Sequence, residues 1–577
     1  MPISVVFVVV LGLFLLAYRT YGVYLARTFG LDAAKRTPAH ELADGEDYVP
    51  TKRGYLLAQH FSAISAAGPI VGPITAGLAF GWLPALLWIV GGCIFIGALH
   101  DFASLVGSVR HKAGSVSVIV REQMSRRAYL LFLGFVWLAL VYVIVAFTDV
   151  TARSFVNALP LENGAVVQGG GIAGASILYL VVGVAMGFAL KFLKMPLKWA
   201  TLVFVPLVGL AIWWGQRSPL VLPFQAGTGP EGLVRTWSYL ILGYCAVASV
   251  VPMWALLQPR GFLGGFFLYG VLAASFAGIL MGGGAEASYP AFLGFESEKL
   301  GLIFPFLFIN IACGACSGFH GLVCSGTTSK QLDRETDAHA VGYGGMLLEG
   351  VVAVISLVCV MMIAPGSPLA SRSPDALYAL GVGNFVAKFG VDPVFAVSFA
   401  ALAFATFVYD TLDVATRLGR YVLQELCGTR SRLSGVLATA ATLALPAYFV
   451  SVKTLDAAGR EVPAWRLFWG IFGASNQLLA GLTLLGLTIW LRNAGKRRGA
   501  LLCAVPMVFM MTTTLWSLSL TIVAAVKRKA GGGVFGAPNV VACVLLSVAV
   551  LLVFEAARAW RNGRGLAAGA DEGAATA

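Results

Sequence analysis

Several ionisable side chains fall inside segments of the chain that are otherwise apolar. These residues are His60, His100, Asp101, His320, Glu349, Asp410 and Asp413. A charge buried without a partner is costly in a bilayer, so each of them is a candidate for function. Histidine changes its charge near neutral pH, and His320 paired with a carboxylate such as Glu349 could carry a proton. A hydrogen-bonded structural histidine explains the same residue, and Asp413–Arg417 indicates a structural i,i+4 ion pair.

Among the predicted apolar spans, the segment 302–324 with its continuation to 328 contains the most polar residues. Its hydroxyl residues Ser325, Thr327 and Thr328 follow His320 at one end. Hydroxyl and carbonyl oxygens there could hold a cation or a proton-linked water. Cys313-x-x-Cys316 has metal-ligand spacing, but a single pair inside an apolar helix favours small packing residues, so we expect no metal site.

Motifs of soluble catalysis and ATP hydrolysis do not occur in the sequence. The chain has no Walker loop, no H-E-x-x-H and no G-x-S-x-G. We therefore predict that the protein is not an enzyme and has neither catalytic residues nor a cofactor.

The stretch Ser62 to Thr75 reads S-A-I-S-A-A-G-P-I-V-G-P-I-T and lies within an apolar segment long enough to cross a bilayer. Proline lacks the backbone N–H and clashes with the preceding turn, so Gly68-Pro69 and Gly72-Pro73 predict an unwound helix. Unwound backbone at membrane depth is tolerated only where protein buries it or a polar cavity adjoins it. In transporters, such breaks bind substrates and ions, although a kink that only shapes packing is the simpler alternative.

Composition places these residues in a membrane protein. The 577 residues are 58% hydrophobic and only 12% charged, against about a quarter charged in soluble chains. At about twenty apolar residues for each span, we predict an all-α polytopic protein of about fifteen membrane helices. They centre on 4–25, 55–78, 82–106, 129–149, 174–193, 197–215, 236–257, 261–284, 302–324, 341–364, 391–413, 433–452, 466–491, 500–526 and 538–559.

The basic residues alternate between loops. The net charge of +13 comes from short Lys/Arg clusters between the apolar spans, as after the first and third spans, and Arg260 follows the seventh span as one of these loop charges. This pattern predicts an outer N-terminus and a cytoplasmic C-terminus, with the lipid bilayer and not nucleic acid as the surrounding partner.

A second interruption lies five spans after the first. Residues 249–261 place Pro252 inside a predicted span and Pro259 at its end. An odd shift reverses the helix direction, and two interrupted helices in oppositely oriented halves favour an inverted-repeat transporter. Coincidence is the alternative, because proline is common in membrane helices.

Five motifs resemble the carbon starvation protein A (CstA) family of the amino acid-polyamine-organocation superfamily. They are D-Y-V-P-T at 47–51, S-A-A-G-P-I-V-G-P at 65–73, S-G-F-H-G-L-V-C-S-G-T-T at 317–328, T-R-L-G-R-Y-V-L-Q-E-L at 416–426 and F-G-A-S-N-Q-L-L-A at 472–480. The resemblance implies a leucine-transporter-like core. It also implies an importer in the bacterial inner (plasma) membrane, used during carbon starvation, with peptides or pyruvate as substrate.

We therefore predict a secondary active transporter coupled to protons or another cation, with a membrane nutrient sensor as the alternative. The predicted substrate-binding residues are Ser65, Gly68, Gly72, Pro252, Trp254, Asn476 and Gln477. The predicted coupling residues are Ser325, Thr327, Thr328, His320 and Glu349.

The predicted segments follow the spans. They are a peripheral helix and cytosolic loop at 1–54, a first five-helix repeat at 55–215, a second repeat with one further helix at 236–452, C-terminal helices at 466–559, and a disordered tail at 560–577. The oligomeric state is left open.

Overall fold

The protein is almost entirely helical, as predicted. The computed structural model describes residues 1–45, 47–223, 229–282, 285–429, 431–452, 462–530 and 536–562. Of the predicted tail at 560–577, residues 560–562 end the last helix and the rest lie outside the described residues.

The helices of the N-terminal half run from the first residues to Met281. They are α1 (Ile3–Ala17), η1 (Tyr18–Gly22), α2 (Val23–Phe29), α3 (Pro38–Glu41), α4 (Arg53–Ile64), α5 (Gly68–Phe80), α6 (Trp82–Gly92), η2 (Cys93–Gly97), α7 (Ala98–Arg110), α8 (Val116–Gln123), α9 (Arg126–Val156), α10 (Gly169–Lys191), α11 (Leu197–Arg217), α12 (Gly229–Val250) and α13 (Leu257–Met281).

The C-terminal half begins with several short pieces and continues with long helices. They are α14 (Ile303–Asn310), α15 (Ala312–Ala315), α16 (Gly318–Val323), η3 (Cys324–Thr328), η4 (Glu335–Asp337), η5 (His339–Tyr343), α17 (Gly344–Met361), η6 (Pro368–Ser371), α18 (Pro374–Ala387), α19 (Pro393–Leu426), α20 (Arg432–Ser451), α21 (Ala464–Asn493), α22 (Arg497–Ala530) and α23 (Ala537–Asn562).

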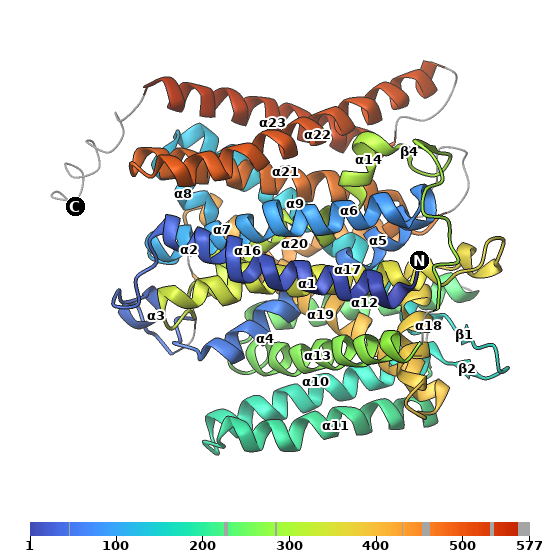
Figure 1. Ribbon diagram of the computed structural model, residues 1–577. Coiled ribbons are helices and arrows are strands. Elements are labelled where there is room, and N and C mark those ends of the chain that lie inside the picture. Colours follow the sequence, from blue (N-terminus) through green and yellow to red (C-terminus); the bar gives the residue numbers. More distant parts are fainter. Residues whose placement is uncertain are drawn as a thin grey trace.

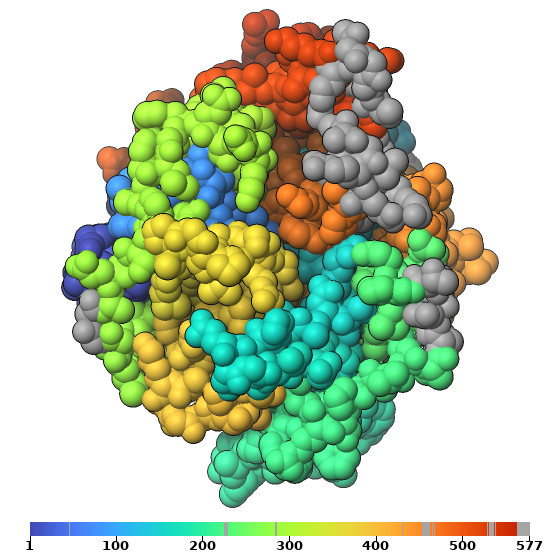
Figure 2. Space-filling view, turned by 90° about the vertical axis from the view of Figure 1, so that its right-hand side faces the viewer, coloured from blue at the N-terminus to red at the C-terminus, as the bar shows by residue number. Residues whose placement is uncertain are grey.

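Two small antiparallel hairpins complete the secondary structure. They pair β1 (Leu159–Pro160) with β2 (Val166–Val167) and β3 (Glu296–Ser297) with β4 (Gly301–Leu302). In Figure 1 the β1–β2 hairpin and β4 lie at one end of the helices, and α3 and α8 lie at the other. Figure 2 looks at the hairpin end, where the β1–β2 hairpin and the region of α18 cover the centre of the surface.

The number of long spans differs from the prediction of about fifteen. Within the described residues, thirteen helices are long and apolar enough to cross a membrane, and the bent pair α4 and α5 makes a fourteenth. The predicted ninth span, 302–324, is instead divided among α14, α15 and α16, none of which is long enough by itself. The prediction of a multi-pass, all-helical membrane protein is confirmed.

The first predicted break is present but begins before the prolines. Helix α4 ends at Ile64, and α5 starts at Gly68 after a bend of 47°. Pro69 therefore occupies the first turn of α5, where a missing N–H costs nothing. The helix continues through Pro73, so the unwound part is Ser65–Ala67 and not the predicted 68–73.

The second predicted break, at 249–261, is wrong. Helix α12 ends at Val250, and Pro252 lies in the connection to α13, outside both helices. The residue before a proline is biased away from helical geometry, so the chain ends a helix here and does not interrupt one.

The second interrupted segment is instead the predicted ninth span. Its backbone leaves helical geometry at Ile311 (φ −99°, ψ 21°) and again at Cys316 (φ −165°, ψ 105°) and Ser317 (φ −107°, ψ 124°). Its α15 packs against α5, its η3 contacts α4, and its α16 packs against α21.

Burial separates a central group of helices from a peripheral group. The most apolar window of α21 is 94% buried and that of α19 is 83% buried, against 28% for α11. Helices α10 and α11 form a hairpin at the lower edge of Figure 1, and α22 and α23 lie along the upper edge. The centre is built from the two interrupted segments with α9, α17, α19 and α21.

Candidate functional site

The two interrupted segments cross at glycine residues, which lack a side chain and so allow close contact. A Cβ added to Gly68 would collide with the side chain of Cys313, and one added to Gly72 would collide with the carbonyl oxygen of Asn310. Asn310 Nδ2 donates to the Gly72 carbonyl at 3.2 Å and to Thr75 Oγ1 at 2.5 Å. The predicted residues Gly68 and Gly72 thus hold the two breaks in contact.

Asn476 of α21 binds the second break. Its Oδ1 accepts the backbone N–H of Phe319 at 2.8 Å, and its Nδ2 donates to Ser317 Oγ at 3.0 Å and to Cys313 Sγ at 2.9 Å. An interrupted helix leaves backbone donors without intrahelical partners. Asn476 therefore stabilises the opening turn of α16, next to His320.

Ser65 lies in the first break with its hydroxyl group unused. The side chain is fully buried, and its Oγ has no hydrogen-bond partner. A buried hydroxyl without a partner is uncommon because it costs free energy. Ser65 therefore places an unpaired polar group in the break.

A histidine cluster, defined here as His100, Asp101, His320 and Glu349, joins three helices. Asp101 of α7 lies 2.8 Å from the Nδ1 atoms of both His100 and His320. The other ring nitrogen of His320, Nε2, lies 3.0 Å from Oε2 of Glu349 on α17. All four side chains are at most 1% exposed. The cluster therefore contains two buried carboxylates, Asp101 and Glu349, that both contact the imidazole of His320.

The three predicted hydroxyl residues of η3 face different neighbours. Thr328 Oγ1 lies 2.9 Å from His60 Nδ1 of α4. Thr327 donates to the carbonyl of Val323 within its own segment. Ser325 accepts the backbone N–H of Val116 at 3.3 Å and so faces α8 instead of the first broken helix.

An arginine cluster, defined here as Arg260, Asp410 and Asp413, was missed by sequence reasoning. Arg260 is fully buried, its Nη1 lies 2.6 Å from Asp413 Oδ2, and its Nη2 contacts Asp410 Oδ1. Sequence reasoning counted Arg260 as a loop residue because it follows Pro259, but α13 already begins at Leu257. The signal that could have found it was the pair of aspartates, which needed a cation.

The predicted Asp413–Arg417 ion pair is wrong. Arg417 Nη2 donates to the carbonyls of Ala248 at 2.8 Å and Val251 at 2.5 Å, at the end of α12. Asp413 is bound instead by Arg260 and by Tyr244, whose hydroxyl donates to Oδ2 at 2.7 Å.

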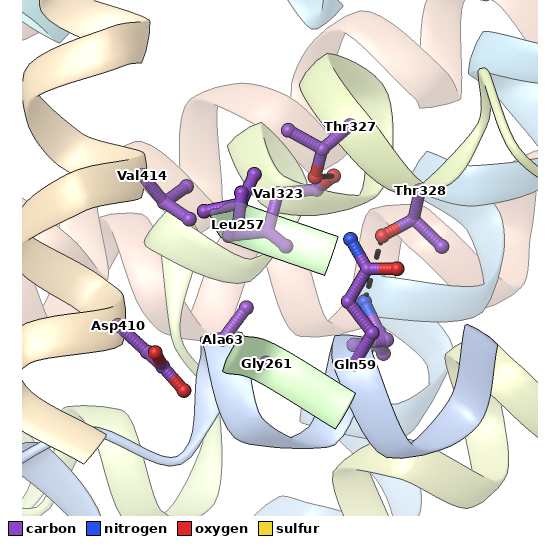
Figure 3. Close-up of a pocket in the computed structure, with 10 residues that line it drawn as sticks. Gln59, Ala63, Leu257, Gly261, Val323, Thr327, Thr328, Asp410 and Val414 are labelled. Carbon is purple, nitrogen blue, oxygen red and sulfur yellow. Dashed lines mark hydrogen bonds between the residues drawn. The ribbon is translucent and has the colours of Figure 1, made fainter. Parts of the chain in front are cut away.

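A narrow cavity lies beside the arginine cluster. It is lined by Gln59, His60, Ala63, Leu257, Gly261, Val323, Thr327, Thr328, Asp410 and Val414. Figure 3 shows Asp410 on one side of it, with Gln59 and Thr328 on the opposite side. The space for the centre of a water molecule is about 10 Å³, which is room for about one water.

Comparison with known proteins identifies the family. The profile of "Carbon starvation protein CstA" matches residues 3–377 and 367–517. The chain belongs to the CstA family. It is 31% identical to the "Peptide transporter CstA" of Campylobacter jejuni over 89% of this chain and 80% of that protein. It is 30% identical to the "Pyruvate/proton symporter BtsT" of Escherichia coli over 90% of this chain and 82% of that protein.

Among solved structures, a manganese transporter of Eremococcus coleocola aligns with 90% of the chain and 99% of its own length. The sequence identity is 13% and the TM-score is 0.47. Membership of the CstA family confirms the prediction of a membrane transporter and not an enzyme.

The remaining predicted residues of this CstA-family chain lie away from the crossing. Pro252 is exposed, and Trp254 packs against Phe188 and Phe192 with Lys191 Nζ 3.9 Å from its ring centre. Gln477 points to α22 and donates to Thr513 Oγ1 at 2.5 Å. Sequence order alone placed Pro252 and Trp254 with the first break, whereas the packing puts Trp254 against the end of α10.

Proposed function

We propose that this protein is a secondary active transporter that imports a small carboxylate nutrient, a peptide or pyruvate, together with protons. The observation that carries the proposal is the histidine cluster: His320 lies between two buried carboxylates on the segment that crosses the broken helix α4–α5. The relatives support both parts, because one is named a peptide transporter and one a pyruvate/proton symporter.

The substrate site of this proposal is the first break. Residues Ser65–Ala67 leave the start of α5 uncapped by any side chain, and a helix N-terminus favours a carboxylate. The unused hydroxyl of Ser65 adds a polar group there. Gly68 and Gly72 let the second break approach, and Asn476 holds that break open.

The coupling site is His320 with Asp101 and Glu349. The imidazole of His320 can gain and lose a proton near neutral pH, and either Asp101 or Glu349 can serve as its hydrogen-bond partner. Because the cluster is fully buried, a proton reaches it only when the surrounding helices move. Proton binding and helix movement are linked in this way, which coupled transport requires. Thr328 extends the polar contacts to His60 on α4.

Packing supports a division into two five-span repeats that differs from 55–215 and 236–452. In the proposed first repeat are α4–α5, α6–α7, α9, α12 and α13, with α10–α11 as an inserted hairpin. In the second are α14–η3, η5–α17, α19, α20 and α21. Equivalent helices of the two repeats make equivalent contacts. The third helices, α9 and α19, pack on each other, as do the fourth, α12 and α20. The fifth helix α13 packs on α4 and α18, and its counterpart α21 packs on α16 and α8.

The orientation follows from the loops. The basic residues after α2 and α7 lie at the end that carries α3 and α8 (Figure 1). We place this end in the cytoplasm of a bacterium and the N-terminus outside, since basic loops stay inside.

Uptake by the purified protein in proteoliposomes tests the proposal. Labelled pyruvate and labelled dialanine are offered separately, with and without an inward pH gradient of one unit. We expect one of them to accumulate, by about tenfold for one coupled proton, because one pH unit corresponds to 1.36 kcal/mol. Saturable binding of either compound without flux under any ion gradient would contradict transport and identify a sensor.

A further inference from the structure

The arginine cluster lies beside the same cavity as His60 and Thr328, but the proton path proposed above does not use it. Arg260 on α13 is fully buried, and Asp410 and Asp413 on α19 are 3% and 2% exposed. Asp410 also accepts a hydrogen bond from Ser62 of α4. The cluster therefore joins α4, the first half of the broken helix, to α13 and α19.

The cluster holds more acid than base. Arginine keeps its proton at every physiological pH, so two ionised aspartates beside one guanidinium leave an excess negative charge. Such a charge is costly inside a membrane protein. The excess is removed if one of the two carboxylates binds a proton.

Several polar and charged groups face the pair from the surrounding helices. They are Ser62 of α4, Tyr179 of α10, Tyr244 and Cys245 of α12, Arg260 of α13, and Tyr409 and Arg417 of α19. Arg417 is a second cation whose charge acts on Asp413 and favours its ionised form, although its hydrogen bonds go to the carbonyls of Ala248 and Val251. Among the described ion pairs, both aspartates contact Arg260 alone.

The surroundings distinguish the two aspartates. Asp413 Oδ2 receives both the Tyr244 hydroxyl at 2.7 Å and Arg260 Nη1 at 2.6 Å, which favours its ionised form. Asp410 Oδ1 contacts Arg260 Nη2, and its Oδ2 accepts from Ser62. Asp410 also lines the cavity, whereas Asp413 is not among the residues that line it. Water in the cavity can therefore exchange a proton with Asp410.

We propose that Asp410 is a second proton-binding group of the transport cycle, while Asp413 stays ionised as the permanent partner of Arg260. This inference rests on the proposed proton-coupled transport. The proton comes from water in the cavity and forms an O–H bond on the Asp410 carboxylate, and it returns to water when that bond breaks.

The proton at Asp410 changes what holds α4. The ionised carboxylate attracts Arg260 and accepts from Ser62, so α4 is tied to α13 and α19. The neutral acid loses most of its attraction for the guanidinium, and the half-helix before the break at Ser65 is released. Proton binding at Asp410 and movement of α4 are therefore linked.

The coupling ratio of Asp410→Asn tests the inference, because asparagine has the shape of the protonated acid but cannot titrate. Glu425→Gln is the matched control: Glu425 lies on the same helix and accepts from Tyr129 and Ser117 through Oε1, which a glutamine oxygen also does. In proteoliposomes we expect D410N to retain substrate exchange and to lose one proton per substrate. Its accumulation then falls by about tenfold for each pH unit of gradient, while E425Q matches the wild type. An unchanged ratio in D410N would overturn the inference.

Carbodiimide labelling of the wild-type protein tests the same point without a variant. The reagent modifies protonated carboxyl groups, and peptide mass spectrometry locates the adduct. We expect Asp410 to be labelled increasingly as the pH falls and Asp413 to remain unlabelled. Labelling of Asp413 in its place, or of neither residue at any pH, would overturn the inference. If the wild type transports nothing, the proposed function fails, but the labelling result still stands.

Discussion

The histidine cluster and the arginine cluster have the same plan: two buried carboxylates face a central base. In the first, Asp101 and Glu349 surround His320, and in the second, Asp410 and Asp413 surround Arg260. The difference lies in the base. Imidazole releases its proton near neutral pH, but guanidinium does not.

This difference determines which member of each cluster is able to titrate. In the histidine cluster the base itself can exchange a proton with its partners. In the arginine cluster the base is a fixed cation, so any proton must go to a carboxylate. The two clusters also join different helices: α7, α16 and α17 in the first, and α4, α13 and α19 in the second. The fixed charge of Arg260 is suited to holding helices together, whereas the titrating imidazole of His320 is suited to carrying a proton.

The largest effect is expected from Arg260→Met. Removing one partner of a buried ion pair leaves uncompensated charge and costs about 3 to 5 kcal/mol. Thermal unfolding in detergent measures this loss. The triple variant R260M/D410N/D413N, which removes the carboxylates as well, is expected to recover most of the stability. An R260M protein as stable as the wild type would end the distinction between the two clusters.

His320→Gln tests the other base. Glutamine still donates a hydrogen bond to a carboxylate, so the loss of unfolding free energy is expected to be smaller, about 1 to 3 kcal/mol. The pH-driven accumulation is expected to fall by the contribution of one proton, about tenfold per pH unit, while exchange continues. His111→Gln is the control, since His111 bonds the Gly107 carbonyl outside the cluster. Undiminished accumulation in H320Q would remove His320 as a carrier.

Asn476→Ala weakens the break that positions the histidine cluster. The backbone N–H of Phe319 loses its acceptor, and a buried donor left without a partner costs about 1 to 3 kcal/mol. We expect reduced stability and slower substrate exchange. Gln477→Ala provides the comparison, because its amide bonds Thr513 of α22 and not the break. Equal rates of exchange in the two variants would mean that Asn476 has no special role there.

The smallest effect separates two neighbouring hydroxyl residues of η3. Thr328→Val removes the partner of His60 next to the cavity, at about 1 kcal/mol. Ser325→Ala affects only contacts with α8 and its own turn. Uptake assays are expected to show slower transport in T328V and wild-type rates in S325A. The reverse order would mean that Ser325, and not Thr328, is the more important of these two predicted coupling residues.

Local sequence predicted the first break well and its partner poorly. Gly68-Pro69 lies at the start of α5, within three residues of the observed break at Ser65–Ala67. The prediction was close because a proline affects the backbone of its own helix. Pro252 looked similar in sequence, but it ends α12 instead of interrupting a span. A proline pattern does not say whether a chain resumes the same direction after the turn.

The polar residues of the candidate site divide in the same way. A pair of His320 with a carboxylate was one of two interpretations of that histidine, and the structure places Glu349 3.0 Å from it. Asp101 was predicted only as one of seven ionisable candidates, and the structure shows that it completes the cluster. Arg260 was counted among loop charges, and only its contacts with Asp410 and Asp413 reveal it as a buried cation.

The sequence by itself determined that this chain is a multi-pass helical membrane protein of the CstA family with an interrupted helix at Ser62–Thr75. These conclusions depend on composition, local backbone chemistry and short motifs, all of which are readable along the chain. The tertiary structure alone decided that the partner of this break is the segment 303–328, and that buried charges form two clusters around different bases. Those facts depend on contacts between helices separated by hundreds of residues, which no local pattern encodes.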